Sequence, residues 1–106
     1  MTEFITSGIW RAKHGEDDAF VAAWGEFAAW ASSMDGAGTL RLMRDLSDPS
    51  KFLSTGIWGS IEQVHTWKGS PEFRERMGRV QQHVAEFKPA ELRTIATAES
   101  GATTAA

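Results

Sequence analysis

The segment FITSGIW at residues 4–10 returns later in the chain as FLSTGIW at residues 52–58. Both copies are rich in aromatic and β-branched residues, a composition that favours β-strands. Each copy is followed by polar turn residues and then by apolar residues at helical spacing. The sequence therefore predicts a β-α-β unit that occurs twice, with a two-fold resemblance between the halves of the chain.

Hydrophobic periodicity, capping residues and turn residues predict the other elements. Ser60 and Ser70 are the expected helix caps. The buried stripe expected on the first helix is Phe20, Trp24, Phe27, Ala31 and Met34. The Asp-Pro-Ser segment at residues 48–50 is expected to form the turn before the second copy. Lys88 and Pro89 are expected to end the last helix, because proline lacks a backbone N–H. In chain order we expect a strand at residues 3–13, a helix at 17–33, a strand at 39–46, a strand at 52–58, a short helix at 60–67, a helix at 70–87 and a strand at 91–98.

This order predicts an α+β fold, the ferredoxin-like β-α-β-β-α-β plait with an antiparallel sheet. The first and third strands then lie side by side at the centre, and the helices cover one face of the sheet. The first strand is apolar on both faces, with Phe4 and Trp10 on one and Ile5 and Ile9 on the other. An apolar face without helices predicts a homodimer through sheet-to-sheet packing.

The composition is that of a single globular domain, with 106 residues of which 42% are hydrophobic and 24% charged. We expect the domain at residues 1–98 and a disordered tail at residues 99–106. Five Trp and six Phe, with no Tyr, indicate wide apolar surfaces, a dimer interface or a cavity for a flat ligand. The net charge of −3 argues against nucleic acid as a partner.

Three further features bear on the compartment of the protein. The chain contains no Cys, which excludes disulfides and thiol chemistry. No apolar run approaches the ~20 residues of a membrane span, so no membrane partner is expected. The segment at residues 1–3 lacks the basic start of a signal peptide, and we therefore predict a cytoplasmic protein.

The stretch WGSIEQVHTWKGSPEF at residues 58–73 carries a family resemblance. Together with the predicted plait, it resembles the antibiotic biosynthesis monooxygenase family over nearly the whole chain apart from the tail. The resemblance implies a dimeric α+β barrel. Members of this family include cofactor-independent monooxygenases that act on polycyclic aromatic polyketides and monooxygenases that degrade haem. The fold by itself says little about function, because the plait supports many activities.

The resemblance also implies roles for single residues. The Asn, Trp and His of the haem-degrading branch correspond here to Ser7, Trp67 and Met77, so only the Trp is retained. With Met77 in the position of the His ligand, we expect no cofactor, and haem stays an alternative. In the polyketide-oxidising branch a catalytic Trp ends the third strand, a position that Trp58 resembles. The Tyr and Arg that accompany that Trp have no clear counterpart in this chain.

Tryptophans and glycines are the first candidates for a site. Trp10, Trp58 and Trp67 either stack on a flat substrate or fill the core, where burial of each contributes ~1.5–3 kcal/mol. Gly8 and Gly56 either admit a ligand close to the backbone or allow Trp to pack across neighbouring strands. The expected substrate-binding residues are Ser7, Gly8, Trp10, Gly56, Phe73 and Met77.

The histidines offer one candidate base. His14, His65 and His83 lack the spacing of metal ligands, so we expect no metal site. His65 precedes Trp67 by two residues, and Glu62 lies one helical turn before it and could orient it. The alternative is a solvated surface histidine. The expected catalytic residues are His65, Trp67 and Trp58.

Three functions remain open from the sequence. The first is a small cofactor-independent monooxygenase that uses O2 on an aromatic or polycyclic, enolisable molecule in an apolar cavity between sheet and helices. The second is a haem-binding or haem-degrading monooxygenase. The third is a dimer that binds a small molecule without catalysis.

Overall fold

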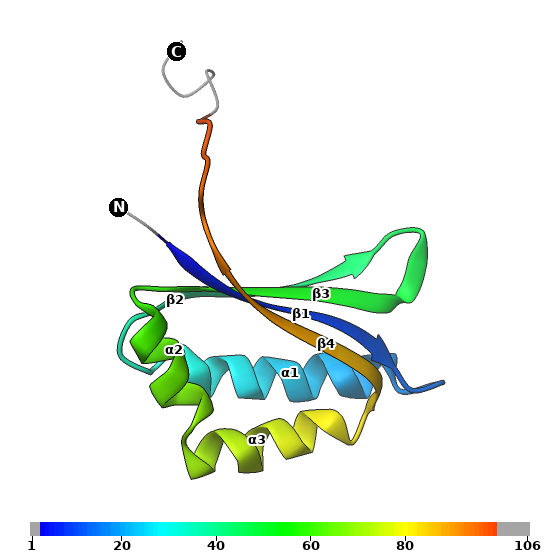
Figure 1. The fold of residues 1–106 in the computed structure, drawn as a ribbon. Helices are drawn as coiled ribbons and strands as arrows, with labels where there is room; N and C mark the ends of the chain where they lie inside the picture. The colour runs from blue at the N-terminus through cyan, green and yellow to red at the C-terminus, as the bar shows by residue number, and fades with distance from the viewer. Residues whose placement is uncertain (1–2, 100–106) are drawn as a thin grey trace.

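The computed structural model describes residues 3–99 and shows an α+β fold of one sheet and one helical layer (Figure 1). The sheet is antiparallel with four strands in the order β2-β3-β1-β4, which confirms the ferredoxin-like plait. All the helices cover the same face of the sheet. In chain order the elements are β1 (Phe4–Ala12), α1 (Asp17–Ala31), β2 (Ala37–Asp45), β3 (Asp48–Trp58), α2 (Ile61–Lys68), α3 (Pro71–Gln81) and β4 (Val84–Arg93).

The two copies of the repeat lie side by side at the centre of the sheet, as expected. They fall in β1 and β3, which pair in antiparallel register with Ser7 opposite Thr55. On either side of this pair, Thr6 lies opposite Gly56 and Gly8 opposite Ser54. The pairing therefore has a local two-fold axis between Ser7 and Thr55, which relates one copy to the other.

The two tryptophans of the repeat are bound in the same way. Trp10 Nε1 donates a hydrogen bond to Ser54 Oγ at 2.9 Å, and Trp58 Nε1 donates one to Thr6 Oγ1 at 3.2 Å. Each tryptophan ends one copy, and each acceptor is the third residue of the other copy. Both indole N–H groups are buried, so these acceptors remove a desolvation cost of about 1–3 kcal/mol each.

The repeated glycines make room for these contacts. A Cβ atom on Gly8 would lie 2.7 Å from Trp10 Nε1, and one on Gly56 would lie 2.9 Å from Thr6 Oγ1. Both distances are shorter than carbon contacts allow. The structure thus shows the packing of tryptophan across strands, which is one of the two roles considered for these glycines.

The core lies between the sheet and the helices. Helix α1 buries Phe20, Trp24, Phe27 and Ala31, the stripe that helical spacing predicts. Helices α2 and α3 begin at the two serines expected to cap them. Ser60 Oγ accepts the N–H of Gln63, and Ser70 Oγ accepts the N–H of Phe73, each at 3.1 Å.

The prediction for the last helix and strand was wrong at their boundary. Helix α3 ends at Gln81, and Val84 and Phe87 belong to β4 instead. Strand β4 pairs with β1 with a register shift beside Ala12, so that Val84 faces Ala12 and Phe87 faces Trp10. The irregularity adds one residue to β4, so that Val84 and Phe87, which both face the core, are three residues apart instead of two. A spacing of three is typical of a helix, which explains the wrong prediction.

Pro89 lies within β4 and does not end a helix. It pairs with Gly8 at the edge of the sheet, since β4 has a neighbour on one side only. An edge strand tolerates proline because the missing N–H costs no hydrogen bond inside the sheet. The strand expected at residues 91–98 therefore starts earlier and ends at Arg93. The tail expected at residues 99–106 lies, apart from Glu99, outside the described residues.

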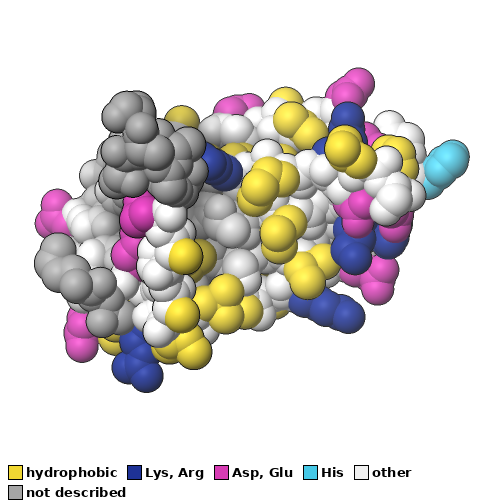
Figure 2. Space-filling view, turned by 90° about the horizontal axis from the view of Figure 1, so that it is seen from above, with side chains coloured by type: hydrophobic (Ala, Val, Ile, Leu, Met, Phe, Trp, Pro, Cys, Tyr) yellow, Lys and Arg dark blue, Asp and Glu magenta, His cyan; other side chains and the backbone are white. Residues whose placement is uncertain are grey.

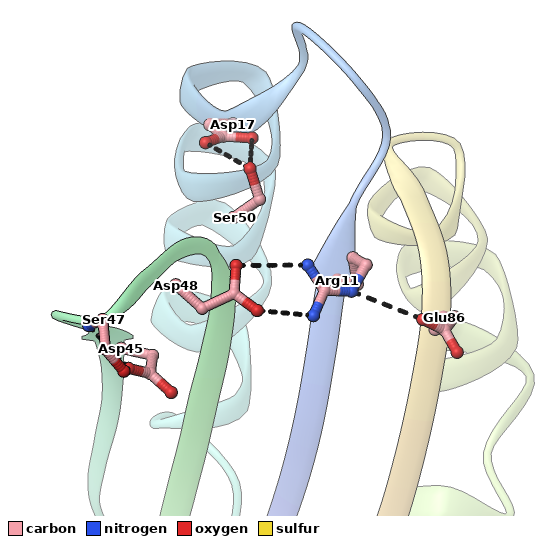
Figure 3. A network of polar contacts seen from close by, with 7 residues as sticks. All are labelled: Arg11, Asp17, Asp45, Ser47, Asp48, Ser50 and Glu86. Carbon is pink, nitrogen blue, oxygen red and sulfur yellow. Dashed lines mark hydrogen bonds and ion pairs between the residues drawn. The ribbon is translucent and has the colours of Figure 1, made fainter.

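The turn between β2 and β3 also differs from the prediction. It consists of Leu46 and Ser47, with Asp45 paired to Asp48, so that the 48–50 segment belongs to β3. The register of the pair shifts between Arg44 and Asp45, so that Pro49 lies in an irregular part of the ladder, where a strand tolerates proline. Near this end of the sheet, Arg11 joins Asp48 at 2.7 Å and Glu86 at 3.4 Å (Figure 3).

The other face of the sheet carries no helix, and apolar side chains gather along it (Figure 2). Five large apolar residues on it are between 37% and 49% exposed: Ile9, Met43, Leu53, Ile57 and Leu92. The sheet is thus apolar on both faces, as expected from the first strand. Within residues 3–99, no helix combines the length and apolarity needed to cross a membrane.

Candidate functional site

A cavity of about 200 Å³ lies between the helix-covered face of the sheet and the helices. Strands β1 and β3 supply the hydroxyl groups of Thr6 and Ser54 and the backbone at Ser7, Thr55 and Gly56, and the helices supply aromatic rings. Its apolar lining consists of Trp10, Trp24, Phe27, Leu40, Trp67, Phe73, Met77, Phe87 and Pro89. Its polar lining consists of Thr6, Ser7, Ser54, Thr55 and Lys68.

Trp67 of α2 forms one wall and is held by other aromatic rings. It packs on Trp58 with ring centroids 4.6 Å apart and meets Phe73 edge-on at 4.8 Å. Phe27 of α1 contacts it from the other helix at 5.7 Å. Its Nε1 is buried and has no hydrogen-bond partner among the described residues. An unsatisfied buried donor costs about 1–3 kcal/mol, a cost that a bound acceptor would relieve.

Trp10 of β1 forms another part of the wall and is equally constrained. It stacks on Phe87 of β4 with centroids 3.9 Å apart and planes 21° apart. The hydrogen bond from its Nε1 to Ser54 also fixes the rotation of the indole within its own plane. Both tryptophan walls therefore lie in fixed positions before any ligand enters, which reduces the entropy cost of binding.

Lys68 is the one charged residue in the lining of this cavity as described. Its side chain is 27% exposed, and its Nζ donates a hydrogen bond to Glu91 Oε2 at 3.1 Å. The other oxygen of Glu91 lies 3.1 Å from Nε2 of His65. These hydrogen bonds hold the pKa of Glu91 below its usual range, and the one with His65 has a larger effect than the one from Lys68.

The structure brings most of the predicted site residues to the cavity, but not all of them. Gly8 lies behind Trp10, and Trp58 is 1% exposed behind Trp67, so neither lines it. The predicted residues that do line it are Ser7, Trp10, Gly56, Trp67, Phe73 and Met77.

The surroundings of His65 differ from those predicted. Its side chain is 61% exposed and does not line the cavity. Its hydrogen-bond partner is Glu91 on β4, and not Glu62 one turn earlier on the same helix. Sequence spacing alone favoured Glu62 because it could not show that β4 passes beside α2. Glu91 thus links His65 to Lys68 in the lining of the cavity.

Sequence reasoning missed Lys68 and the hydroxyls of Thr6 and Ser54. A lone lysine next to a tryptophan carries no recognisable signature, so Lys68 could not be found in this way. The two hydroxyls could have been predicted from the repeat. In an antiparallel pair of the two copies, the third residue of each copy lies near the tryptophan that ends the other copy.

Among the residues that the structure describes, the lining of this cavity contains no histidine that could ligate haem iron. Ser7, Trp67 and Met77, the positions that correspond to the haem-degrading branch, do meet in the lining. All three histidines lie outside it, and a volume of about 200 Å³ is below the ~300–1,000 Å³ of typical cofactor sites. Within residues 3–99, His, Asp and Glu side chains nowhere come together in threes as metal ligands would.

The fold and this cavity define a small plait protein with an aromatic cavity between the sheet and the helices. The chain matches the antibiotic biosynthesis monooxygenase family over residues 5–79 and belongs to it. No curated protein matches the chain.

Solved structures of similar proteins share the fold across nearly their whole length. A protein from Deinococcus radiodurans named for the same family is 20% identical, covers 92% of this chain and 96% of its own, and gives a TM-score of 0.78. A protein from Chloroflexus aurantiacus that is also named for this family is 24% identical, covers 93% of this chain and 97% of its own, and gives a TM-score of 0.72. SnoaB from Streptomyces nogalater, a cofactor-independent oxygenase solved as a mutant, is 13% identical, with coverage of 92% and 95% and a TM-score of 0.76.

Proposed function

We propose that this protein is a monooxygenase that oxidises a small aromatic molecule with O2 in the cavity between sheet and helices, without a bound cofactor. The observation that carries the proposal is the preformed cavity walled by Trp10, Trp67 and Phe73 in a chain of this family. The similarity to SnoaB, a cofactor-independent oxygenase, supports the absence of a cofactor.

The chemistry suits such a cavity because the substrate supplies all the electrons. The enol or phenol oxygen loses its proton, and the resulting anion shares its charge with a carbon that bears hydrogen. This carbanion form reduces O2 and forms a C–O bond with it. Protonation gives a hydroperoxide, which loses water and leaves a carbonyl group. One oxygen atom enters the product and the other leaves as water, so CH2 plus O2 gives C=O plus H2O. Exclusion of water by the apolar walls protects the carbanion from reprotonation.

The aromatic residues divide into walls and supports. Trp67 and Trp10 form aromatic walls against the substrate, with Phe73 and Met77 closing the helical side. Trp58 supports Trp67 from behind and is a positioning residue. His65 acts on the reaction indirectly, through its hydrogen bond to Glu91.

We propose further that two copies pack their open sheet faces together. Leu53 lies at the middle of this face, opposite Ile9 on β1 and Met43 on β2, and all three are about 40% exposed. Burial of such apolar area stabilises a dimer by about 25 cal/mol per Å² before the costs of association. The small side chains of Ser7 and Thr55 near the local two-fold axis allow the sheets to approach closely. A cytoplasmic dimer with a small substrate, and no nucleic acid or membrane partner, stays our prediction.

Oxygen uptake tests the proposed activity. Purified protein, treated with a chelator and free of absorbing cofactors, is mixed with a panel of one- to three-ring phenols and cyclic 1,3-diketones in an oxygen electrode. We expect uptake above the protein-free rate, with one atom of ¹⁸O2 in the product. Uptake at the protein-free rate for the whole panel would contradict the proposal.

A further inference from the structure

The lining of the cavity contains one cation and no acid or imidazole. Lys68 is its single charged residue, and no Asp, Glu or His among the described residues lines it. A reaction that begins with loss of a proton usually needs such a base in contact with the substrate. A substrate that is already an anion does not need one. It needs a positive partner for its oxygen.

Lys68 can act as that partner. Its ammonium group has three donors, and one of them binds Glu91 at 3.1 Å, so that two are left for a ligand. The pairing with Glu91 holds the ammonium group of this lining residue in place. An ammonium group beside an enolate or phenolate in surroundings of low polarity favours the ionised form, and so lowers the pKa of the ligand.

The volume of the cavity limits the size of the ligand. About 200 Å³ is slightly more than a cavity of ~150 Å³ that takes up benzene, and less than the ~300 Å³ at which typical ligand sites begin. The stacking walls of Trp10 and Trp67 favour a flat molecule. One ring or two fused rings fit a cavity of this volume.

Building on the proposed function, we infer that the substrate is a one- or two-ring phenol or cyclic enol that binds as its oxyanion, paired with Lys68. Glu91 is the positioning residue of Lys68. The oxyanion carries the electrons that reduce O2, so the same ion pair that binds the substrate also prepares the group that reacts. The proton of the substrate leaves to solvent before binding, and the cavity needs no base of its own.

Binding of 4-nitrophenol tests this inference without oxidation. This phenol ionises near neutral pH with a change in absorbance, and its methyl ether, 4-nitroanisole, has nearly the same shape and no charge. For the wild-type protein above neutral pH, we expect binding of the phenolate about ten-fold tighter than that of the ether. We also expect a pKa of the bound phenol about one unit below that of the free phenol, the equivalent of this ten-fold factor.

Matched variants assign the effect to Lys68. Lys68→Met keeps the length of the side chain and should abolish both the preference and the pKa shift, while Lys68→Arg should keep them. Lys13→Met, which removes an exposed lysine just after β1, should leave both unchanged. Equal binding of phenolate and ether to the wild type, an unchanged preference in Lys68→Met, or no binding of either compound would overturn the inference.

The two proposals can fail separately. Oxygen uptake with equal binding of phenolate and ether would leave the monooxygenase in place and refute the anionic substrate. Lys68-dependent binding of phenolate without oxygen uptake by any compound of the panel would refute the monooxygenase and leave an anion-binding cavity.

Discussion

Gly8 and Gly56 determine how closely the central tryptophans approach the sheet. Each glycine lies where a side chain would collide with the hydrogen bond between an indole and a hydroxyl on the neighbouring strand. The local two-fold symmetry of the sheet thus depends on matched glycines, tryptophans and hydroxyls rather than on sequence repetition as such. The two tryptophans are equivalent in the sheet but not with respect to the cavity. Trp10 lines the cavity, whereas Trp58 packs behind Trp67.

Gly8→Ala should destabilise the protein by about 1–3 kcal/mol, because overpacking at this site displaces Trp10 or Phe87. The free energy of unfolding in urea measures the effect. Gly25→Ala is the matched control, since a Cβ there meets nothing within 4 Å and alanine favours the helix. We expect this control to gain about 0.5–1 kcal/mol. A Gly8→Ala protein as stable as the wild type would refute the packing role.

At the scale of elements, the starts of the helices and the two central strands followed from the sequence, whereas the end of α3 and the edge strand β4 did not. Repetition of FITSGIW identified β1 and β3, and serine caps identified the starts of α2 and α3. The irregular pairing of β4 misled the periodicity argument, because its extra residue gave Val84 and Phe87 a helical spacing. That error also concealed Phe87, Pro89 and Glu91, all of which bear on the site. A site built from several separate elements requires the correct position of each.

The ends of β1, β3 and β4 are joined by Arg11, which contacts Asp48 and Glu86 (Figure 3). The hydrogen bond from Arg11 holds the pKa of Asp48 below its ordinary value of 3.8. Since the folded state then binds fewer protons than the unfolded state, this interaction stabilises the protein above about pH 4. The stabilisation is lost as the pH falls through the folded pKa.

Asp48→Asn should therefore lower stability at neutral pH and reduce the further loss of stability below about pH 4. Urea unfolding between about pH 3 and pH 7 measures both changes. Asp35→Asn, in the exposed turn after α1, is the control and should keep the acid dependence of the wild type. An Asp48→Asn protein with that same acid dependence would show that the contact with Arg11 does not contribute.

At the scale of the whole molecule, one layer of helices leaves the sheet half covered. The helix-covered face contains the core and the cavity, and the open face carries Leu53 between Ile9 and Met43. The sequence could predict both apolar faces from strand alternation. It could not predict the cavity, whose walls come from side chains brought together by the packing of α1, α2 and α3 on the sheet.

Light scattering at micromolar concentration should give the wild-type protein twice the mass of one chain. Leu53→Lys should convert it to a monomer, because a charge at the middle of the open face would be buried in the dimer. Val21→Lys is the matched control, since Val21 is similarly exposed, at 40%, on α1, and it should leave the dimer intact. A monomeric wild type, or a Leu53→Lys protein that stays dimeric, would contradict sheet-to-sheet packing.

The cavity under the sheet is the place where we propose that oxygenation occurs. The most direct test is oxygen uptake by Met77→Trp, which fills the cavity from α3, compared with Met77→Leu, which conserves its volume. Urea unfolding and circular dichroism establish that both variants are folded. We expect Met77→Trp to lose nearly all uptake with the compounds that the wild type oxidises, while Met77→Leu keeps most of it. A folded Met77→Trp protein that consumes oxygen at the wild-type rate would contradict oxygenation in this cavity.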